Sequence, residues 1–409
     1  MKQLTFIFLF VLNVHITPSA TAQSRAEHCI MFYNAENLFH PSDDSIAADD
    51  DFTPEGVRRW NFFRYKRKIA KICKVILAVN GWEPPDAVCL SEIENREVLN
   101  DIIFHPLMLR QQYLPLHRDS PDHRGIDVGI IYRRDRMECL DTAWIEIRTA
   151  QDQLVRTREI LAATFRLKAT GDTVVLFSNH WTSKYGGALE TEDQRLLQAR
   201  LLGAYINALL GARSPGACSG ALPASQTPDQ HIDTLPVRRS FSTHRISIIA
   251  GGDLNDLSGS PPVQLLSDSF NLQEVPTMTG NVHGGPSMPN ASYKYRGNWA
   301  SIDHVFVGGR LHAEDCRAMV FSHSFLLEED TKYTGVKPFR TYSGFRYHGG
   351  FSDHLPLLLH FVVENHREDD RENDRQNDQQ NDRQDDREND RENDQQNDQQ
   401  NDRGHDRED

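Results

Sequence analysis

The sequence predicts an α/β fold, and three features support this prediction. Short runs rich in β-branched residues and leucine alternate along the chain with segments of helical periodicity. Two of these segments, residues 60–80 and 191–211, have a single apolar face, which is typical of helices that cover one side of a sheet. Most of the β-rich runs end in polar or charged residues, which indicates a functional site at the strand ends.

The N-terminal residues 1–22 have the layout of a signal peptide. Lys2 precedes the apolar run LTFIFLFVLNV, and small residues follow up to Ala20-Thr21-Ala22. We therefore expect cleavage after Ala22 and a secreted or periplasmic protein. The apolar run is too short to span a bilayer and no second candidate follows it, so we expect no transmembrane anchor.

Residues 367–409 form a low-complexity acidic and polar tail. Aspartate recurs every fourth residue from Asp370 to Asp406, and no aliphatic side chain, Phe, Tyr or Trp follows His366. Such a segment cannot bury enough apolar surface to offset its ordering entropy, so we predict disorder, with a partner-binding tail as the alternative. Its 18 acidic residues and 8 arginines give −10 of the chain's −14, which leaves −4 for the rest. That balance neither predicts nor excludes a polyanionic substrate.

The body, residues 23–366, is compatible with one large domain. It contains all the cysteines, and no two of them form a CxxC pair, which argues against zinc-ribbon and thioredoxin folds. Six cysteines allow 15 pairings, so no disulfide connectivity is predicted. The six are Cys29, Cys73, Cys89, Cys139, Cys218 and Cys316.

Both predicted helices have recognisable ends. The first stops at Asn80-Gly81 and has a basic polar face, and the second opens with Thr191 and Gln194 in a capping-box pattern. Residues 212–243 are rich in Pro, Ser, Gly and Thr and predict a long loop. The apolar face of the first helix comprises Phe62, Tyr65, Ile69, Ile72, Cys73 and Ile76.

Five or six strands deliver Asn, Asp, Glu or His near one of their ends. One such residue alone is usually a turn residue, a helix cap or a solvated side chain, but turn chemistry favours Gly, Ser and Pro as much as carboxylates. The run GFSDHLPLLLHF, residues 350–361, even enters a strongly apolar strand through an aspartate and a histidine. If the strand ends meet at one rim, the clustered acids need a cation, and oxygen ligands without cysteine suit Mg²⁺, Mn²⁺ or Ca²⁺ better than zinc. The strand-end segments are Asn34–Asn37, Ser91-Glu92, Asn179-His180-Trp181, Asp253–Asp256, Asp303 and Ser352-Asp353-His354.

In order along the chain, YNAEN, LSEIEN, SNHWTSKYGG, GGDLND, SIDHV and SDHLP resemble the motifs of the endonuclease/exonuclease/phosphatase superfamily. The resemblance spans roughly residues 30–362, and FYNAENLF and YKYRGNW are similar to segments of secreted bacterial members. It implies a four-layer α/β sandwich, in which two facing, mostly antiparallel sheets carry helices on their outer sides. The single apolar face of both predicted helices agrees with this architecture.

The resemblance also implies roles for the strand-end residues. Glu92 matches the metal-binding glutamate and Asn34 an amide that contacts metal or phosphate. Glu36 and Asp353 are further candidate metal ligands, although Glu36 falls where many members have Asp or Asn. The implied cofactor is Mg²⁺, with Mn²⁺ or Ca²⁺ as alternatives.

The same motifs imply a set of catalytic residues. Asp253 and Asn255 match the pair that orients the attacking water and holds the phosphate. Asp303 matches the acid that fixes the tautomer of His354, and His180 matches a histidine that contacts phosphate or protonates the leaving oxygen. Either His354 or Asp253 can serve as the general base, and the choice stays open at this point.

Four residues are candidate substrate contacts. Lys184 can grip a substrate phosphate, although a solvated loop lysine fits equally well. Tyr293, Lys294 and Arg296 interleave aromatic and basic side chains in a pattern suited to nucleic acid, with an exposed strand edge as the alternative. Arg124 and Asp127 resemble a strand near the family's site, but Asp127 fits a buried structural carboxylate as well.

These expectations give three hypotheses about function. The first is a secreted, metal-dependent phosphodiester hydrolase, specifically an endonuclease. The second is the same chemistry on a phospholipid, sugar or inositol phosphate. The third is a non-catalytic binding protein that kept the fold, which the complete set of site residues argues against. No protein partner is inferred.

Overall fold

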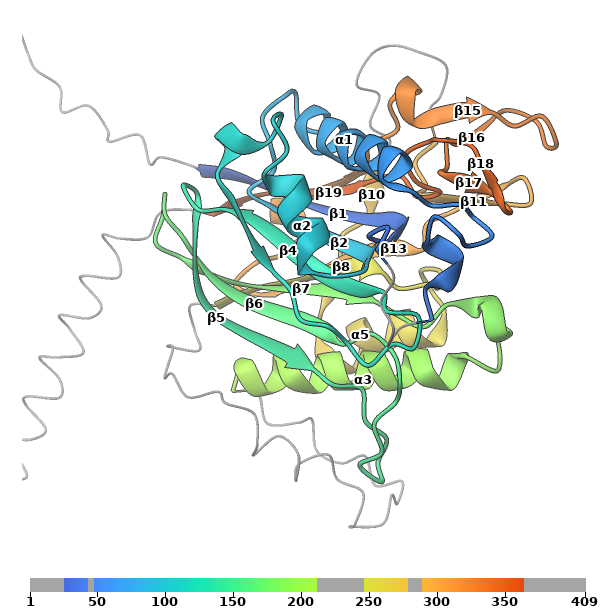
Figure 1. Ribbon diagram of the computed structural model, residues 1–409. Coiled ribbons are helices and arrows are strands. Elements are labelled where there is room, and N and C mark those ends of the chain that lie inside the picture. The colour runs from blue at the N-terminus through green and yellow to red at the C-terminus, as the bar shows by residue number, and fades with distance from the viewer. Residues whose placement is uncertain (1–25, 43–47, 212–245, 279–288, 364–409) are drawn as a thin grey trace, which may run out of the picture. The chain divides into compact units, whose positions relative to one another are not determined.

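Two β-sheets pack face to face at the centre of the computed structural model, which describes residues 26–42, 48–211, 246–278 and 289–363 (Figure 1). The predicted signal peptide, the predicted loop 212–243, the tail from residue 367 and Cys218 lie outside the described residues. Residues 26–363 cluster into one compact unit.

The first sheet has seven strands in the order β10-β14-β19-β1-β2-β4-β3. The second has six, in the order β5-β6-β7-β8-β13-β9. Neighbouring strands run antiparallel except in the pairs β1–β2, β7–β8 and β10–β14. The strands of the first sheet are β10 (Thr277–Met278), β14 (Cys316–Val320), β19 (Leu357–Val363), β1 (Ala26–Leu38), β2 (Ala87–Ile93), β4 (Asp127–Arg133) and β3 (Tyr113–Leu116). Those of the second are β5 (Met137–Ile145), β6 (Ile160–Leu167), β7 (Thr173–His180), β8 (Ile246–Asp253), β13 (Asp303–Gly309) and β9 (Gln273–Glu274).

Helices cover both outer faces, so the predicted four-layer sandwich is confirmed. Helices α1 (Phe62–Ala78) and α2 (Arg96–Ile103) lie on the first sheet, and α3 (Glu192–Leu209) and α5 (Pro261–Phe270) lie on the second (Figure 1). Three short hairpins complete the described strands, namely β11 (Tyr293–Tyr295) with β12 (Asn298–Ala300), β15 (Leu327–Glu329) with β16 (Val336–Pro338), and β17 (Tyr342–Ser343) with β18 (Arg346–Tyr347). The 3-10 helices are η1 (Asp50–Phe52), η2 (Leu109–Gln111), η3 (Lys184–Gly186), η5 (Ala313–Asp315) and η6 (Ser324–Leu326).

The predicted helices form where the sequence placed them, with two differences in detail. Asn61 caps α1 by accepting a hydrogen bond from the backbone N–H of Arg64 at 3.1 Å. The predicted apolar face of α1 is buried except for Phe62, the first residue of the helix, whose side chain is 48% exposed. In α3, Thr191 does not form the predicted capping box, because its hydroxyl instead donates to the carbonyl of Gly187 at 2.7 Å.

The space between the sheets is filled by close packing. Phe32 of β1 packs against Gly251 of β8, where a Cβ atom would lie 2.7 Å from the Phe32 ring. At the next residue, Gly252, φ is +132° and a Cβ would overlap the carbonyl oxygen of Asn179 on β7. Glycine is therefore required at both positions just before Asp253, one for sheet packing and one for strand packing.

Strand register brings the predicted strand ends together. On the second sheet, Asp253 pairs with His180 of β7 on one side and with Asp303 of β13 on the other. On the first sheet, Asn34 pairs with Ser91, the residue before Glu92. His354 precedes β19, which runs antiparallel to β1, so it lies at the same edge as the end of β1. The predicted gathering at one rim is confirmed.

The described cysteines, Cys29, Cys73, Cys89, Cys139 and Cys316, are all unpaired. Within the described ranges, no helix combines the length and apolar character needed to cross a membrane.

One ion pair, between the buried His304 and the partly exposed Glu274, makes the stability of this fold depend on pH. The imidazole of His304 on β13 is hydrogen bonded to Glu274 through Nδ1 at 2.8 Å and to the Asp256 carbonyl through Nε2 at 2.8 Å. Burial alone lowers the pKa of His304, but the bonds to Glu274 and to the Asp256 carbonyl outweigh it and raise the pKa above its ordinary value. The pKa of Glu274 is lowered, because the bonds from His304 and Ser258 outweigh its burial.

We expect His304→Ala to lower the free energy of unfolding by about 2–4 kcal/mol, through a lost ion pair and a cavity. The loss should be greater at pH 5.5 than at pH 9. A raised histidine pKa stabilises the fold fully below the unfolded value near 6.5, and this contribution disappears as the pH rises through the folded pKa. Urea unfolding at both pH values measures the difference, with the exposed His312→Ala as control. An equal loss at both pH values would contradict a charged His304.

Candidate active site

A bulge at the end of the first sheet sets the direction of Glu92. The register between β1 and β2 shifts after Asn34, and that between β2 and β4 shifts after Ser91. Glu92 has a φ of +59°, and Asn37 on the neighbouring strand has a φ of +48°. Non-glycine residues in this left-handed region are strained, and bulges of this kind redirect side chains at functional sites. The backbone N–H of Asn37 donates to Glu92 Oε2 at 2.7 Å and holds the carboxylate in place.

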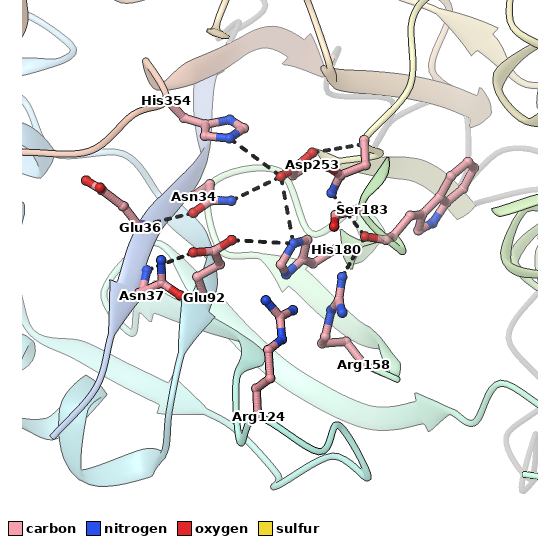
Figure 2. Close-up of polar contacts among 12 residues, drawn as sticks. Asn34, Glu36, Asn37, Glu92, Arg124, Arg158, His180, Ser183, Asp253 and His354 are labelled. Carbon is pink, nitrogen blue, oxygen red and sulfur yellow. Dashed lines mark hydrogen bonds and ion pairs between the residues drawn. The ribbon is translucent and has the colours of Figure 1, made fainter. Parts of the chain in front are cut away.

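Asp253 lies at the centre of the rim (Figure 2). Its Oδ2 accepts a hydrogen bond from Asn34 Nδ2 at 3.0 Å, and its Oδ1 accepts one from the backbone N–H of Asn255 at 2.9 Å. The Nε2 atoms of His180 and His354 lie 3.8 Å and 3.7 Å from the same Oδ2. Burial raises the pKa of Asp253 to about 7, against the lowering effect of His354.

His354 is oriented by Asp303. Its Nδ1 lies 2.8 Å from Asp303 Oδ2, so Nδ1 carries the donated proton and Nε2 faces Asp253. Burial alone lowers the pKa of His354, but the charges of Asp303 and Asp253 outweigh it and raise the pKa well above its ordinary value. The ring of Tyr293 lies over the same imidazole, with 4.9 Å between centroids.

His180 has the opposite electrostatic environment. Burial, followed by the charges of Arg158 and Arg124, holds its pKa well below the ordinary value, so the imidazole is neutral. Its Nε2 lies 3.8 Å from Glu92 Oε1, and its buried Nδ1 has no hydrogen-bond partner among the described residues. The two histidines at this rim therefore differ in charge although both contact Asp253.

Arg158 is a site residue that the sequence analysis missed. Its Nη1 pairs with Asp122 at 3.0 Å, and its Nη2 donates to the carbonyl of Trp181 at 2.6 Å. That carbonyl also accepts from Asn255 Nδ2 at 3.1 Å, so Arg158 helps to orient Asn255. The available signal was a buried strand entered through Thr157-Arg158-Glu159, the same pattern as at Asp353-His354. Arg124, which the sequence analysis noted, lies beside His180 in Figure 2.

Glu36 does not join the other predicted metal ligands. Its carboxylate points away from Glu92 and Asp253 (Figure 2) and accepts hydrogen bonds from the backbone N–H of Thr341 at 2.6 Å and of Tyr342 at 3.3 Å. Asn34 and Glu36 would share a face in a regular strand, but the bulge after Asn34 breaks that alternation. The structure thus gives Glu36 an anchoring role for the 340–342 segment.

Asp353 is paired with an arginine rather than with the other acids. Its Oδ2 lies 2.7 Å from Nη2 of Arg340, whose Nε also lies 3.4 Å from Glu36 Oε1. Lys68 from α1 lies 4.0 Å from Glu36 Oε2. These four residues form a charged cluster behind His354.

The predicted substrate contacts divide into two kinds. Tyr293 lies against His354, and Arg296 is exposed at the β11–β12 turn. Lys294 is buried, and its three N–H donors bind Asp330, the carbonyl of Thr334 and the carbonyl of Val336, so its prediction as a substrate contact is not supported. Lys184 is only partly free, because its Nζ lies 2.7 Å from Asp256 Oδ1.

The residues at the rim fit a hard divalent cation. Glu92 Oε1 and Asp253 Oδ2 each lie 3.8 Å from His180 Nε2, beyond hydrogen-bond distance. Asn34 donates to Asp253 Oδ2 through Nδ2, and its Oδ1 accepts from the backbone N–H of Glu36 at 2.9 Å, so Asn34 orients Asp253 and offers no ligand oxygen in this arrangement. Two carboxylates next to a neutral histidine leave negative charge that a cation neutralises, and oxygen ligands select Mg²⁺, Mn²⁺ or Ca²⁺.

A second acidic group lies beside this rim. Ligand atoms of His117, Asp119 and Asp127 lie within 4.8 Å of one another, but Asp127 accepts hydrogen bonds from Ser120 and from His117 Nε2 at 3.1 Å. Asp127 pairs with Ile93, next to Glu92. Its bonding supports the structural alternative for Asp127.

A family of known proteins matches most of this chain. The model of the Endonuclease/Exonuclease/phosphatase family matches residues 29–217 and 243–363. No curated protein sequence matches the chain significantly.

Solved structures with a similar fold include the human nocturnin catalytic domain, with 15% identity, a TM-score of 0.46, and coverage of 83% of this chain and 98% of that one. An endonuclease/exonuclease/phosphatase family protein from Bacteroides thetaiotaomicron has 15% identity, a TM-score of 0.49, and coverage of 83% and 99%. A mannosyl-6-phosphatase from the same organism has 16% identity, a TM-score of 0.48, and coverage of 82% and 99%.

Metal binding at the rim should raise thermal stability. We expect millimolar Mg²⁺ or Mn²⁺ to raise the Tm by a few degrees, because a ligand at about 100 times its Kd adds about 2.7 kcal/mol to the folded state. Glu92→Gln should remove most of this increase, whereas Glu36→Gln should keep it despite a lower starting Tm. Differential scanning fluorimetry measures each shift, and the exposed Glu97→Gln is the control. Loss of the increase in Glu36→Gln alone would restore Glu36 as a ligand.

Proposed function

Because the chain belongs to the endonuclease/exonuclease/phosphatase family, it is a phosphoester hydrolase, and we propose that it is a secreted, divalent-metal-dependent endonuclease. The observation that carries the proposal is that several side chains converge on Asp253. Asn34 donates to it, and His354, held by Asp303, lies 3.7 Å from it. His180 lies 3.8 Å from both Asp253 and Glu92. Secretion rests on the predicted signal peptide at residues 1–22.

Glu92 and Asp253 would hold the metal ion through their carboxylate oxygens, and Asn34 would orient Asp253. A divalent cation there supplies a Lewis acid for the phosphoryl oxygens and lowers the pKa of bound water. Family members are generally metal dependent, and Mg²⁺ is our proposed ion, with Mn²⁺ or Ca²⁺ as alternatives.

Asp253 and the side chains around it have two tasks, which are to accept the proton of the attacking water and to stabilise the charge on the phosphoryl oxygens. Asp253 accepts the proton of the attacking water, which Asn255 helps to place. The Nε2 atoms of His354 and His180 face the same space and donate to the phosphoryl oxygens, where negative charge grows as the bond to phosphorus forms. The bond to the leaving oxygen then breaks, and that oxygen takes a proton from solvent.

Nucleic acid is favoured by aromatic and basic side chains around the rim. Tyr185 is fully exposed next to Lys184, and Tyr295 is 57% exposed next to Arg296. Exposed rings beside cations are suited to stacking on bases and contacting backbone phosphates.

A small phosphoester is the second candidate substrate. One observation supports this second candidate: Lys294 and Lys184 already pair with Asp330 and Asp256, which leaves fewer free cations for a polyanion. A lipid head group, sugar phosphate or inositol phosphate presents fewer charges to neutralise.

Cleavage of supercoiled plasmid tests the endonuclease proposal. We expect nicking with Mg²⁺ or Mn²⁺ that EDTA abolishes and that His354→Ala reduces by at least about 10³-fold, because one donor and its charge are lost at the phosphate. The exposed His312→Ala should behave as the parent protein. Intact plasmid together with hydrolysis of a small phosphoester, or release of a head group from liposomes, would favour the second candidate.

Asp303 should act through the orientation of His354. We expect Asp303→Asn to reduce kcat by about 10²–10⁴-fold with little change in KM, because the amide changes the tautomer and charge of the imidazole. Hydrolysis of a chromogenic phosphodiester measures both constants across pH, and the exposed Asp268→Asn on α5 is the matched control. An unchanged kcat would show that the Asp303–His354 bond has no part in the reaction.

A further inference from the structure

Helix α1 carries an unusual concentration of positive charge. Residues 56–82 contain eight lysines and arginines and no acidic residue, although residues 1–366 as a whole carry a net charge of only −4, with 37 cations and 41 acids. Four of these cations, Arg64, Arg67, Lys71 and Lys74, follow one another at spacings of three and four, so they form one line along the helix. We call this line the α1 basic stripe.

Within the part of the chain that the structure describes, no acidic side chain pairs with the cations of the stripe. Among the described residues, Lys68 is the one cation of α1 that forms an ion pair, with Glu36. Arg64 donates instead to the carbonyls of Arg58 and Arg59, and Lys71 donates to the carbonyl of Gly349. Burial, followed by the charges of Arg67 and Lys74, lowers the pKa of Lys71, which is consistent with crowded like charges.

Aromatic rings from the segment 325–351 hold the stripe in position. The guanidinium of Arg64 lies 4.4 Å from the ring centre of Tyr347, and Lys74 Nζ lies 4.2 Å from that of Phe325. Lys71 Nζ lies 4.7 Å from the ring centre of Phe351. Cations placed over rings are preorganised, so less entropy is lost when they bind an anion. Two nearby rings, Phe63 and Phe345, are 69% and 64% exposed.

The stripe is physically connected to the catalytic rim. Lys68, on the same helix, donates to the carbonyl of Phe351 and to the hydroxyl of Thr341. Phe351 is followed directly by Ser352, Asp353 and His354. A ligand lying along α1 is therefore adjacent to the segment that carries His354.

We propose that the α1 basic stripe binds the sugar-phosphate backbone of a nucleic-acid strand and holds it beside the catalytic rim. From Arg64 to Lys74 the stripe is about 15 Å long, at 1.5 Å per residue. Along the axis of duplex DNA each strand carries one phosphate per 3.4 Å, so the stripe is as long as the axial rise of about four phosphates. The exposed Phe63 and Phe345 are then placed to stack on bases of a single-stranded region. This inference deepens the proposed nuclease function and depends on it for its purpose.

Charge reversal on the full-length chain tests the proposal. The variant Arg67→Glu/Lys74→Glu changes two exposed residues, and Arg200→Glu/Lys168→Glu changes the charge equally at exposed positions on α3 and after β6. A fluorescein-labelled 20-nucleotide single-stranded DNA is titrated in EDTA, which separates binding from cleavage, and anisotropy is read at several salt concentrations. The stripe variant should bind at least about tenfold more weakly and have a salt slope lower by about two, whereas the control pair should change little. Hydrolysis of a small chromogenic diester should be unchanged in both variants.

The outcomes separate this proposal from the proposed function. Weaker DNA binding in the stripe variant without plasmid nicking by the parent protein would support the stripe and contradict the endonuclease. Plasmid nicking by the parent protein, together with equal DNA binding by the stripe variant and the parent, would support the endonuclease and contradict the stripe. Loss of binding to phosphatidylserine vesicles in the stripe variant, with DNA binding intact, would overturn the proposal in favour of a membrane surface.

Discussion

The arrangement at the rim depends on one buried carboxylate, that of Asp253. It lies at the end of β8, between His180 and Asp303 in the strand register, and it accepts a hydrogen bond from Asn34 on the other sheet. An isolated carboxylate at this depth is unfavourable, so each neighbour contributes to keeping it there. The same demand for positive charge raises the pKa of His354 and makes the rim suited to a divalent cation. The carboxylate of Asp253 is therefore both costly to bury in the folded protein and central to the chemistry at the rim.

The fold and most of the rim could be predicted because both depend on strand ends. A buried strand needs apolar residues, so the polar residues that interrupt it, such as Asp253 and His354, are visible in the sequence. The errors arose where local rules were overridden. Glu36 was predicted as a metal ligand, but the bulge after Asn34 turned its carboxylate towards the backbone of Thr341. The alternation of aromatic and basic residues around Lys294 predicted an exposed side chain. In the structure Lys294 pairs with Asp330, 36 residues later, and no local pattern indicates such a long-range contact.

A charged cluster holds the 340–353 segment beside the rim. It consists of Glu36, Lys68, Arg340 and Asp353. Burial and the charge of Asp353 raise the pKa of Glu36, against the opposing charges of Lys68 and Arg340. Removing one member leaves an unpaired buried charge, which costs more than the intact cluster contributes. The cluster joins α1 to the 340–353 segment, so the helical layer and the segment that carries His354 are held together by charge rather than by apolar packing alone.

The rim is assembled from both sheets, and this has a consequence for how the protein tolerates change. Asn34 and Glu92 lie on one sheet and His180, Asp253 and Asp303 on the other, while Phe32 and Gly251 set the separation of the sheets within two residues of Asn34 and Asp253. A displacement of about 1 Å at reacting groups can lower a rate about 10²-fold, whereas a volume-conserving exchange of core side chains usually costs less than about 1.5 kcal/mol of stability. A substitution between the sheets should therefore lower the catalytic rate before it lowers the stability enough to unfold the protein, and natural selection should act on that loss of rate first. Sequence drift in this layer would be restricted by the spacing of the sheets, even at positions that never contact the substrate.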